Sequence, residues 1–186
     1  MGLWVKIIFL GLGTGLILWY SRTSLINWRS HGFYRFFAWE LILILICVNI
    51  DFWIKDPLAI HQLIAWFLLI ISLVWIIWGV RMMRKIGKPD ETRTDDPTLL
   101  GIEKTSQLVT VGIFKYIRNP LYSSLLFLNW GAFFKHPSWI GLCLAIPASL
   151  FLFITAKIEE RENINFFGEP YREYMKKSKM FIPYLW

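Results

Sequence analysis

Two short polar segments beside apolar runs contain the residue types and spacings that can do chemistry. The first is Arg118-Asn119-Pro120, which directly precedes an apolar run. A helix beginning here presents unpaired backbone N–H groups beside an arginine, and this combination attracts a carboxylate or a phosphate. Asn119 can also cap that helix by accepting from its first amides, and Pro120 is tolerated at the first helical position. The triplet therefore predicts a helix start, with or without a bound anion.

The second segment follows the last apolar run and carries the adjacent carboxylates Glu159 and Glu160. On a helix, Glu159 shares a face with Asn163, whereas Glu160 turns to a different face. One carboxylate can then point back toward the cytoplasmic mouth of the bundle and hold an ammonium group or a ribose hydroxyl. The alternative is a solvated helix end, in which the glutamates pair with Lys157 and Arg161.

A third segment, residues 169–179, alternates aromatic side chains with lysines. Pro170 suits the first position of a short helix, on which Tyr171, Tyr174 and Met175 fall on one face. This pattern is typical of a helix that lies at a membrane interface. Such a helix serves either as an anchor or as a roof over a site.

The chain that carries these segments has more apolar surface than a soluble domain of its length can bury. Its 186 residues are 56% hydrophobic, include 11 Trp and have a mean hydropathy of +0.48. A membrane protein is therefore the first expectation. The net charge of +7 is explained by basic cytoplasmic loops, and nucleic-acid binding is not expected.

Metal and disulfide chemistry are not expected either. The two cysteines, Cys47 and Cys143, each lie in an apolar run with no second ligand at metal-binding spacing. The three histidines, His31, His61 and His136, are scattered through separate segments, and we interpret them as interfacial polar residues. The sequence therefore predicts no metal site.

Five apolar runs approach the length needed to cross a bilayer. They cover residues 3–20, 36–54, 58–79, 121–134 and 139–156, and the short fourth run is expected to begin inside the polar segment before it. All but three of the 20 basic residues fall in the loops on one side, and Lys6, Lys55 and Lys135 fall on the other. The positive-inside rule then predicts five spans, with the amino end outside and the carboxyl end in the cytoplasm.

We therefore predict an all-α integral membrane bundle of about five helices, forming one domain over residues 1–186. Three spans occupy residues 1–80, a cytoplasmic connector covers 81–118, the last two spans cover 119–158, and a cytoplasmic or interfacial segment covers 159–186. Nearly all the polar chemistry falls on the cytoplasmic face. The site is expected there, capped by the connector and the C-terminal segment.

Taken together, the polar segments resemble the isoprenylcysteine carboxyl methyltransferase and phospholipid methyltransferase family of integral membrane enzymes. LVTVGIFKYIRNPLY (108–122) is similar to the family's Leu-Val-x-x-Gly-x-Tyr followed by Arg-His-Pro-x-Tyr. EERENINFFGEPYREY (159–174) is similar to its Glu-Glu, spacer, Phe-Gly-x-x-Tyr-x-x-Tyr, and the closing MFIPYLW resembles its terminal apolar-Pro segment. The resemblance covers about residues 100–186, while the first three spans match only as generic helices.

The resemblance implies methyl transfer from S-adenosylmethionine, bound on the cytoplasmic side, to a lipid-like or prenylated acceptor that arrives through the bilayer. The acceptor group can be a carboxylate, an amine or a thiol. The resemblance implies catalytic roles for Arg118 and Glu160, a bacterial-type member of the family, and a location in the inner membrane. The cofactor contacts that it implies are Leu108, Val109, Gly112, Tyr116, Arg118, Asn119, Pro120, Tyr122, Glu159 and Glu160.

Two departures from the family pattern bear on the chemistry. Asn119 stands where the family usually has His, so a general base is not expected at that position. Asn can still donate or accept a hydrogen bond, which is sufficient for orienting a cofactor. Asn163 replaces an apolar position and makes the Glu-Glu helix more polar than the pattern predicts.

Two other functions stay open from the sequence. One is a membrane reductase that binds a nicotinamide cofactor in a related carboxyl-terminal bundle. The other is a non-catalytic membrane assembly or lipid-binding protein, in which the motifs act only as helix caps and anchors. Binding of S-adenosylhomocysteine favours the methyltransferase, a response to NADPH alone favours the reductase, and a response to neither favours the third reading.

Overall fold

The computed structural model describes residues 2–88, 99, 101 and 103–185; residues 89–98, 100 and 102 of the predicted connector lie outside this set. The six longer helices are α1 (Leu3–Ser21), α2 (His31–Asn49), α3 (Ile60–Met82), α4 (Pro120–Lys135), α5 (Trp139–Phe167) and α6 (Glu169–Lys177). The shorter helical turns are η1 (Ser24–Ile26), η2 (Ile50–Phe52), η3 (Met83–Gly87) and η4 (Gly112–Lys115). Apart from one isolated parallel bridge between Ile117 and Lys179, the described secondary structure is helical. The predicted all-α class is confirmed.

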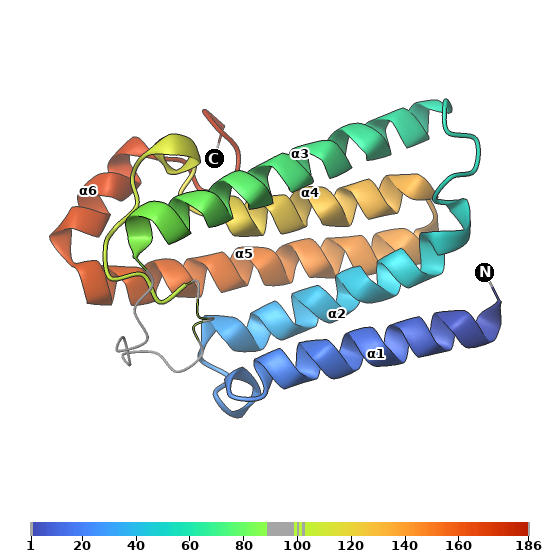
Figure 1. The fold of residues 1–186 in the computed structure, drawn as a ribbon, viewed down its shortest axis with the longest axis horizontal. Helices are drawn as coiled ribbons and strands as arrows, with labels where there is room; N and C mark the ends of the chain where they lie inside the picture. Colours follow the sequence, from blue (N-terminus) through green and yellow to red (C-terminus); the bar gives the residue numbers. More distant parts are fainter. Residues whose placement is uncertain (1, 89–98, 100, 102, 186) are drawn as a thin grey trace.

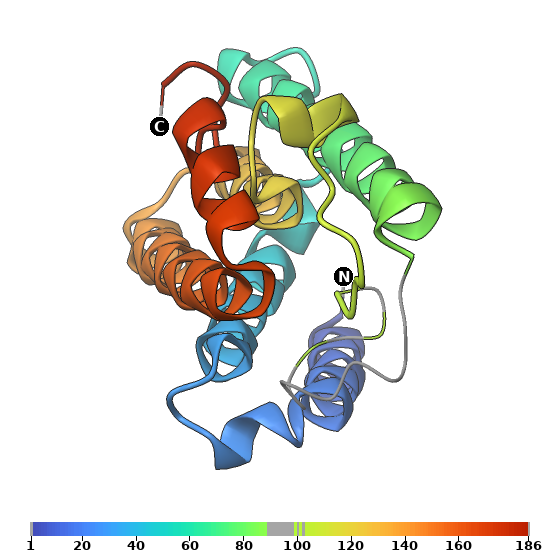
Figure 2. The same cartoon turned by 90° about the vertical axis from the view of Figure 1, so that its left-hand side faces the viewer.

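The first five long helices run side by side along one axis, and α6 lies across one end of them (Figure 1). α3 packs against α4, and α2 packs against α5. α1 lies on the outside of the bundle, where it packs against α2 (Figure 2). The two approach closely at Gly13, where a Cβ would lie 2.6 Å from Leu43 Cδ2, and Thr14 Oγ1 donates to Glu40 Oε2 across 2.9 Å.

Four helical segments are long and apolar enough to cross a membrane: Leu3–Ser21, His31–Phe52, Ile60–Gly87 and Trp139–Phe167. The fifth expected span, α4, has 16 residues. At 1.5 Å per residue it is about 24 Å long, which is shorter than the roughly 30 Å of a hydrocarbon core. It packs against α2, α3 and α5, and Asn129 and Ala132 on it are fully buried. Because α4 is surrounded by longer helices, it does not need to match the lipid thickness by itself.

Two helix boundaries differ from the predicted spans. α2 begins at His31 instead of residue 36, because Ser30 caps it by accepting from the Phe33 N–H at 3.3 Å. α5 continues to Phe167 instead of ending at residue 156, because its charged continuation is rich in Glu, which favours helix. It ends at Gly168, which has a φ of 67°. The last three turns of α5 thereby carry the carboxylates beyond the apolar run.

At the end of the bundle opposite α6, a buried lysine connects α4 to α3. Lys135 is fully buried, and its Nζ lies 3.2 Å from the centroid of the Trp66 ring. The same ammonium donates to Gln62 Oε1 at 3.0 Å and to the Trp53 carbonyl at 3.2 Å. This cluster ties α4 to the start of α3, and it is separated from α6 by the length of the bundle (Figure 1).

Candidate functional site

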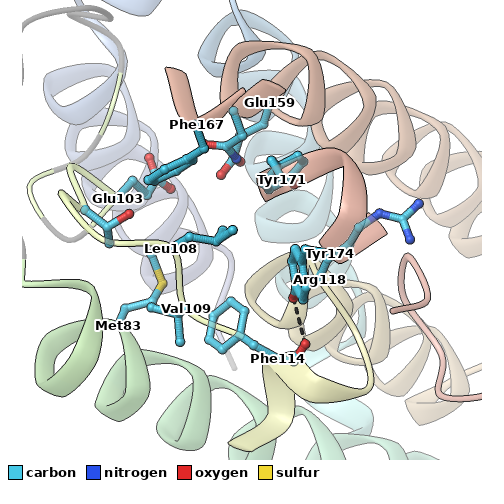
Figure 3. Close-up of a pocket in the computed structure, with 12 residues that line it drawn as sticks. Met83, Glu103, Leu108, Val109, Phe114, Arg118, Glu159, Phe167, Tyr171 and Tyr174 are labelled. Carbon is cyan, nitrogen blue, oxygen red and sulfur yellow. Dashed lines mark hydrogen bonds between the residues drawn. The ribbon is translucent and has the colours of Figure 1, made fainter. Parts of the chain in front are cut away.

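A cavity opens at the end of the bundle where the connector, the start of α4, the end of α5 and α6 meet (Figure 3). It consists of two adjoining pockets, whose enclosed parts are small, about 60 and 40 Å³. The residues that line both pockets are Met83, Glu103, Phe114, Arg118 and Glu159.

The two pockets differ in the residues that complete them. The larger one, here called the connector pocket, is completed by Thr105, Leu108, Val109, Asn163, Phe167, Tyr171 and Tyr174. The smaller one, here called the α4 pocket, is completed by Asn119, Pro120, Leu121 and Tyr122. The connector pocket therefore has polar and aromatic walls, and the α4 pocket reaches toward the first turn of α4.

Two carboxyl groups line both pockets of the cavity. Glu159 comes from α5 and accepts a hydrogen bond from the Tyr122 hydroxyl. Glu103 comes from the connector, and both of its carboxylate oxygens lie 2.7 Å from Arg35 Nη1. Asn163 lines the connector pocket one turn after Glu159, which confirms that these two side chains share a face of the helix.

Aromatic rings form the wall of the connector pocket beneath α6. The Tyr174 hydroxyl donates to the Phe114 carbonyl at 2.7 Å, and the rings of Phe167 and Tyr171 stack at 6.4 Å with an interplanar angle of 15°. Burial raises the pKa of Tyr171, as do the nearby carboxylates of Glu160 and Glu159, so its hydroxyl stays neutral. The aromatic face of α6 thus lies inward, as a roof over the cavity.

Glu160 does not line either pocket. It is 2% exposed, and its carboxylate accepts from Arg118 Nε and, at 2.9 Å, from Asn119 Nδ2. Arg118 Nη1 also donates to the Ser178 carbonyl at 2.8 Å. Figure 3 shows the Arg118 guanidinium turned away from the other side chains of the cavity, so its contribution to the wall is its stem. The two residues with implied catalytic roles form an ion pair that joins the segment just before α4 to α5 behind the cavity.

Asn119 does not form the predicted cap, because its amide is engaged by Glu160 and makes no bond to the first amides of α4. Pro120 takes the first helical position as predicted. The backbone N–H groups before the helix are also occupied: Arg118 N–H donates to the Lys179 carbonyl at 2.8 Å, and Asn119 N–H donates to the Met180 carbonyl at 3.3 Å. The C-terminal tail (residues 178–185) therefore pairs with the two residues that precede α4.

The other predicted contacts divide between lining and supporting positions. Leu108 and Val109 line the connector pocket, and Tyr122 lines the α4 pocket together with Pro120. Gly112 lines neither pocket. It has a φ of 63°, and a Cβ there would lie 2.9 Å from Met82 Sδ, so the glycine is needed for its backbone conformation and its close approach to α3.

Tyr116 also lies outside both pockets. Its side chain is 41% exposed, and its ring centroid is 6.2 Å from that of Tyr184. Its carbonyl accepts from the Lys179 N–H at 2.9 Å. Tyr116 thus contacts the C-terminal tail, and its backbone takes part in the pairing of the connector with that tail.

A cluster of Arg35, His31 and Glu103 beside the cavity is absent from the predicted site residues. Arg35 fell among the basic loop residues, yet it lies within α2 and is 1% exposed. His31, interpreted as interfacial, is fully buried, and its Nδ1 lies 2.6 Å from Glu162 Oε2. Glu103 lies outside all the sequence motifs described above. Among the described residues, no three His, Cys, Asp or Glu side chains form a metal-binding group.

The solvated helix end considered for the glutamates is not what the structure shows. Glu159 turns into the cavity and Glu160 is buried against Arg118. Lys157 Nζ lies 3.7 Å from Glu160 Oε2, at the edge of ion-pair distance. Glu162 reaches across to α2 instead of pairing along its own helix.

Residues 60–170, more than half of the chain, match the phospholipid methyltransferase family model. The chain is 30% identical over 89 residues to methanethiol S-methyltransferase 1 of Bradyrhizobium diazoefficiens and 32% identical over 74 residues to methanethiol S-methyltransferase of Pseudomonas deceptionensis. It is 25% identical over 122 residues to the methanethiol S-methyltransferase of Pseudomonas sp. strain GM41(2012). No solved structure matches.

The alignments cover 46%, 39% and 62% of this chain but only 30%, 27% and 45% of those relatives. The chain thus aligns with less than half of the length of each of these relatives. The family model, by contrast, covers α3, the connector, α4 and α5, which supply most of the residues around the cavity. Together with the apolar helical bundle, this match shows that the chain belongs to the phospholipid methyltransferase family of integral membrane proteins.

Proposed function

We propose that this protein transfers a methyl group from S-adenosylmethionine to a nucleophilic acceptor that enters the cavity from the bilayer. The observation that carries the proposal is a cavity with two carboxylates, Glu103 and Glu159, and aromatic walls, within a chain of a methyltransferase family. When bound, S-adenosylmethionine supplies a methyl group activated by a sulfonium charge. Carboxylates and aromatic faces suit a ligand that carries sulfonium and ammonium charges.

The connector pocket is the better candidate for the cofactor. Glu103 can accept from an ammonium group or from ribose hydroxyls, while Phe114, Tyr171 and Tyr174 offer flat faces to a planar base. Arg118 and Glu160 act behind this wall by fixing the start of α4 against α5. Their role in the proposal is to keep the cavity in shape and to exclude water from it.

The α4 pocket is the candidate for the acceptor. Pro120 and Leu121 supply apolar surface to it, and Glu159 stands where the two pockets join. A thiol or amine acceptor must release a proton when it is methylated, and Glu159 is placed to receive that proton with the Tyr122 hydroxyl bonded to its carboxylate. A carboxylate acceptor needs no such base.

The names of the relatives and the position of the α4 pocket support one class of acceptor. The three matching proteins are named for S-methylation of methanethiol, which supports a small thiol as the acceptor. The α4 pocket shares Glu103 and Glu159 with the connector pocket, so an acceptor in it would lie beside the cofactor. A lipid amine or a prenylated cysteine carboxylate, implied by the family resemblance, is the alternative.

The proposal places the protein in a bacterial inner membrane, with its amino end outside and the cavity facing the cytoplasm. The distribution of basic residues supports this orientation. The orientation is tested by placing one cysteine at exposed Lys177, in a background where Cys47 and Cys143 are replaced by Ala. An impermeant thiol reagent should label Lys177→Cys from the cytoplasmic side alone.

The function is tested by methyl transfer in proteoliposomes, using S-adenosylmethionine with a labelled methyl group. The acceptors are methanethiol, phosphatidylethanolamine and a prenylated cysteine. We expect transfer to the thiol, and we expect Glu159→Gln to lower kcat by about 10²-fold or more while binding of S-adenosylhomocysteine changes little. Glu173→Gln is the control, because Glu173 is an exposed carboxylate paired with Lys176.

Each contrary result has a definite meaning. Transfer to a lipid but not to the thiol would replace the acceptor assignment and keep the reaction type. Equal kcat in the wild type and Glu159→Gln would remove Glu159 as the proton acceptor. Absence of transfer to every acceptor, together with absence of S-adenosylhomocysteine binding by folded protein, would overturn the proposed function.

A further inference from the structure

Helix α2 contacts a residue of the cavity wall, although α2 lies outside the segment that matches the family. The match begins at residue 60, whereas Arg35 and His31 stand in the first two turns of α2. Both side chains are buried and reach toward the connector, where Glu103 lines both pockets. Helix α2 therefore supplies charged contacts to this site as well as apolar packing.

The contacts form a continuous polar chain from the outer side of α5 to the cavity. Glu162 Oε2 lies 2.6 Å from His31 Nδ1, His31 Nε2 lies 3.5 Å from Arg35 Nη1, and Arg35 Nη1 lies 2.7 Å from Glu103 Oε1. His31 Nε2 also lies 3.8 Å from Glu103 Oε2, so the imidazole stands between two carboxylates and beside Arg35. Each member thus fixes the orientation of the next.

Arg35 is itself held firmly, so it can fix the position of Glu103 in the connector. Its guanidinium carbon lies 5.1 Å from the centroid of the Trp39 ring, one turn further along α2. Glu103, in contrast, belongs to a connector without regular secondary structure at that residue. A carboxylate has about four lone-pair positions, so it can accept from Arg35 and still accept from a ligand in the cavity.

We propose that Arg35, with His31 behind it, is a positioning residue that holds the Glu103 carboxylate at the wall of the cofactor cavity. The inference rests on the proposed function and deepens it, because it assigns part of the cofactor site to α2. In this assignment Glu103 contacts the cationic or hydroxyl groups of the cofactor, and Arg35 acts only through Glu103.

The test is a double-mutant cycle on binding of S-adenosylhomocysteine to the detergent-purified full chain. Arg35→Gln and Glu103→Gln should each weaken binding by about 10- to 100-fold, the range for charge-assisted hydrogen bonds. The double variant should bind no more weakly than Glu103→Gln alone, within about threefold, because both changes remove the same contact. In turnover, the loss should appear in KM for S-adenosylmethionine more than in kcat.

Two control variants separate this role from general effects on folding. Lys135→Met removes a buried cation at the opposite end of the bundle, and Arg29→Gln removes an exposed arginine just before α2. Both should leave the affinity of the folded protein unchanged. Arg35→Lys keeps the positive charge but has a shorter side chain that ends in a single ammonium group. It is used if Arg35→Gln does not fold. It should bind more weakly than wild type, since one ammonium cannot reproduce the guanidinium geometry.

The outcomes distinguish this inference from the function on which it rests. If folded wild-type protein binds no S-adenosylhomocysteine, the proposed function fails and this assignment fails with it. If wild type binds and folded Arg35→Gln or Arg35→Lys binds equally well, the positioning role alone is overturned. Additive losses in the double variant would also overturn it, because Arg35 would then act independently of Glu103.

Discussion

Replacing Glu160 separates the role that the structure gives it from the role implied by the family motif. The motif implies contact with the cofactor, whereas in the structure the carboxylate lies behind the cavity. There it accepts from Arg118 Nε and from Asn119 Nδ2. We therefore expect Glu160→Ala to lower stability strongly and to have little direct effect on cofactor affinity.

The size of the effect follows from what the substitution leaves behind. Removing one partner of a buried ion pair costs about 3–5 kcal/mol. Arg118 keeps its bond to the Ser178 carbonyl and its side chain is 11% exposed, so the lower end, about 3 kcal/mol, is expected for Glu160→Ala. For a chain of this length, that corresponds to a fall in Tm of about 6–12 °C. Glu160→Gln keeps the shape and one acceptor oxygen, so its cost should be about 1.5 kcal/mol.

The assay measures Tm by tryptophan fluorescence in detergent and then S-adenosylhomocysteine affinity at a temperature where each variant is folded. Glu173→Gln is the control, since this exposed carboxylate should change neither quantity. We expect the Tm order wild type, Glu160→Gln, Glu160→Ala, with affinities within about threefold of one another. A Glu160 variant with unchanged Tm and abolished affinity would refute the reasoning and return Glu160 to the cofactor site.

Two further predictions concern residues in the connector and in α6. Gly112→Ala should destabilise by about 2 kcal/mol, because a φ of 63° strains a residue with a Cβ and this atom would meet Met82; a loss of cofactor affinity at unchanged Tm would contradict this. The raised pKa of Tyr171, caused first by burial, means that its contribution to stability is complete below its ordinary pKa of 10.0. Above that pH, stability should fall by about 1.4 kcal/mol per pH unit until the folded hydroxyl ionises, and Tyr171→Phe should make the fall shallower by that amount in alkaline unfolding. Equal slopes for wild type and variant would show that Tyr171 is not buried.

The fold was predictable where it depends on local pattern. Apolar runs and the distribution of basic residues predicted the helices and brought the polar segments to one end of the bundle. Pro120 marked the start of α4, and the spacing of Glu159 and Asn163 predicted their common face. These features depend on neighbours in sequence, so a single chain is enough to find them.

The parts that could not be predicted depend on contacts between distant segments. Whether Glu159 or Glu160 faces the cavity is decided by how α5 is rotated against α4, and helical spacing does not contain that information. Arg35 pairs with Glu103 across 68 positions, and the sequence offers only an arginine at the start of an apolar run as a signal. An intramembrane charge of this kind is itself a reason to look for a partner.

The C-terminal tail is a second case of this kind. Its carbonyls at Lys179 and Met180 accept from the N–H groups of Arg118 and Asn119, the two residues before α4. Local rules cannot foresee a strand-like partner that comes from the end of the chain.

The central claim is that the cavity bounded by Glu103 and Glu159 binds the methyl donor, and one titration tests it most directly. Detergent-purified wild-type protein is titrated calorimetrically with S-adenosylhomocysteine, with NADPH as the comparison ligand. We predict saturable binding of one S-adenosylhomocysteine per chain, weakened by Glu103→Gln, and no binding of NADPH. Folded protein that binds NADPH and not S-adenosylhomocysteine, or that binds neither, would contradict the account.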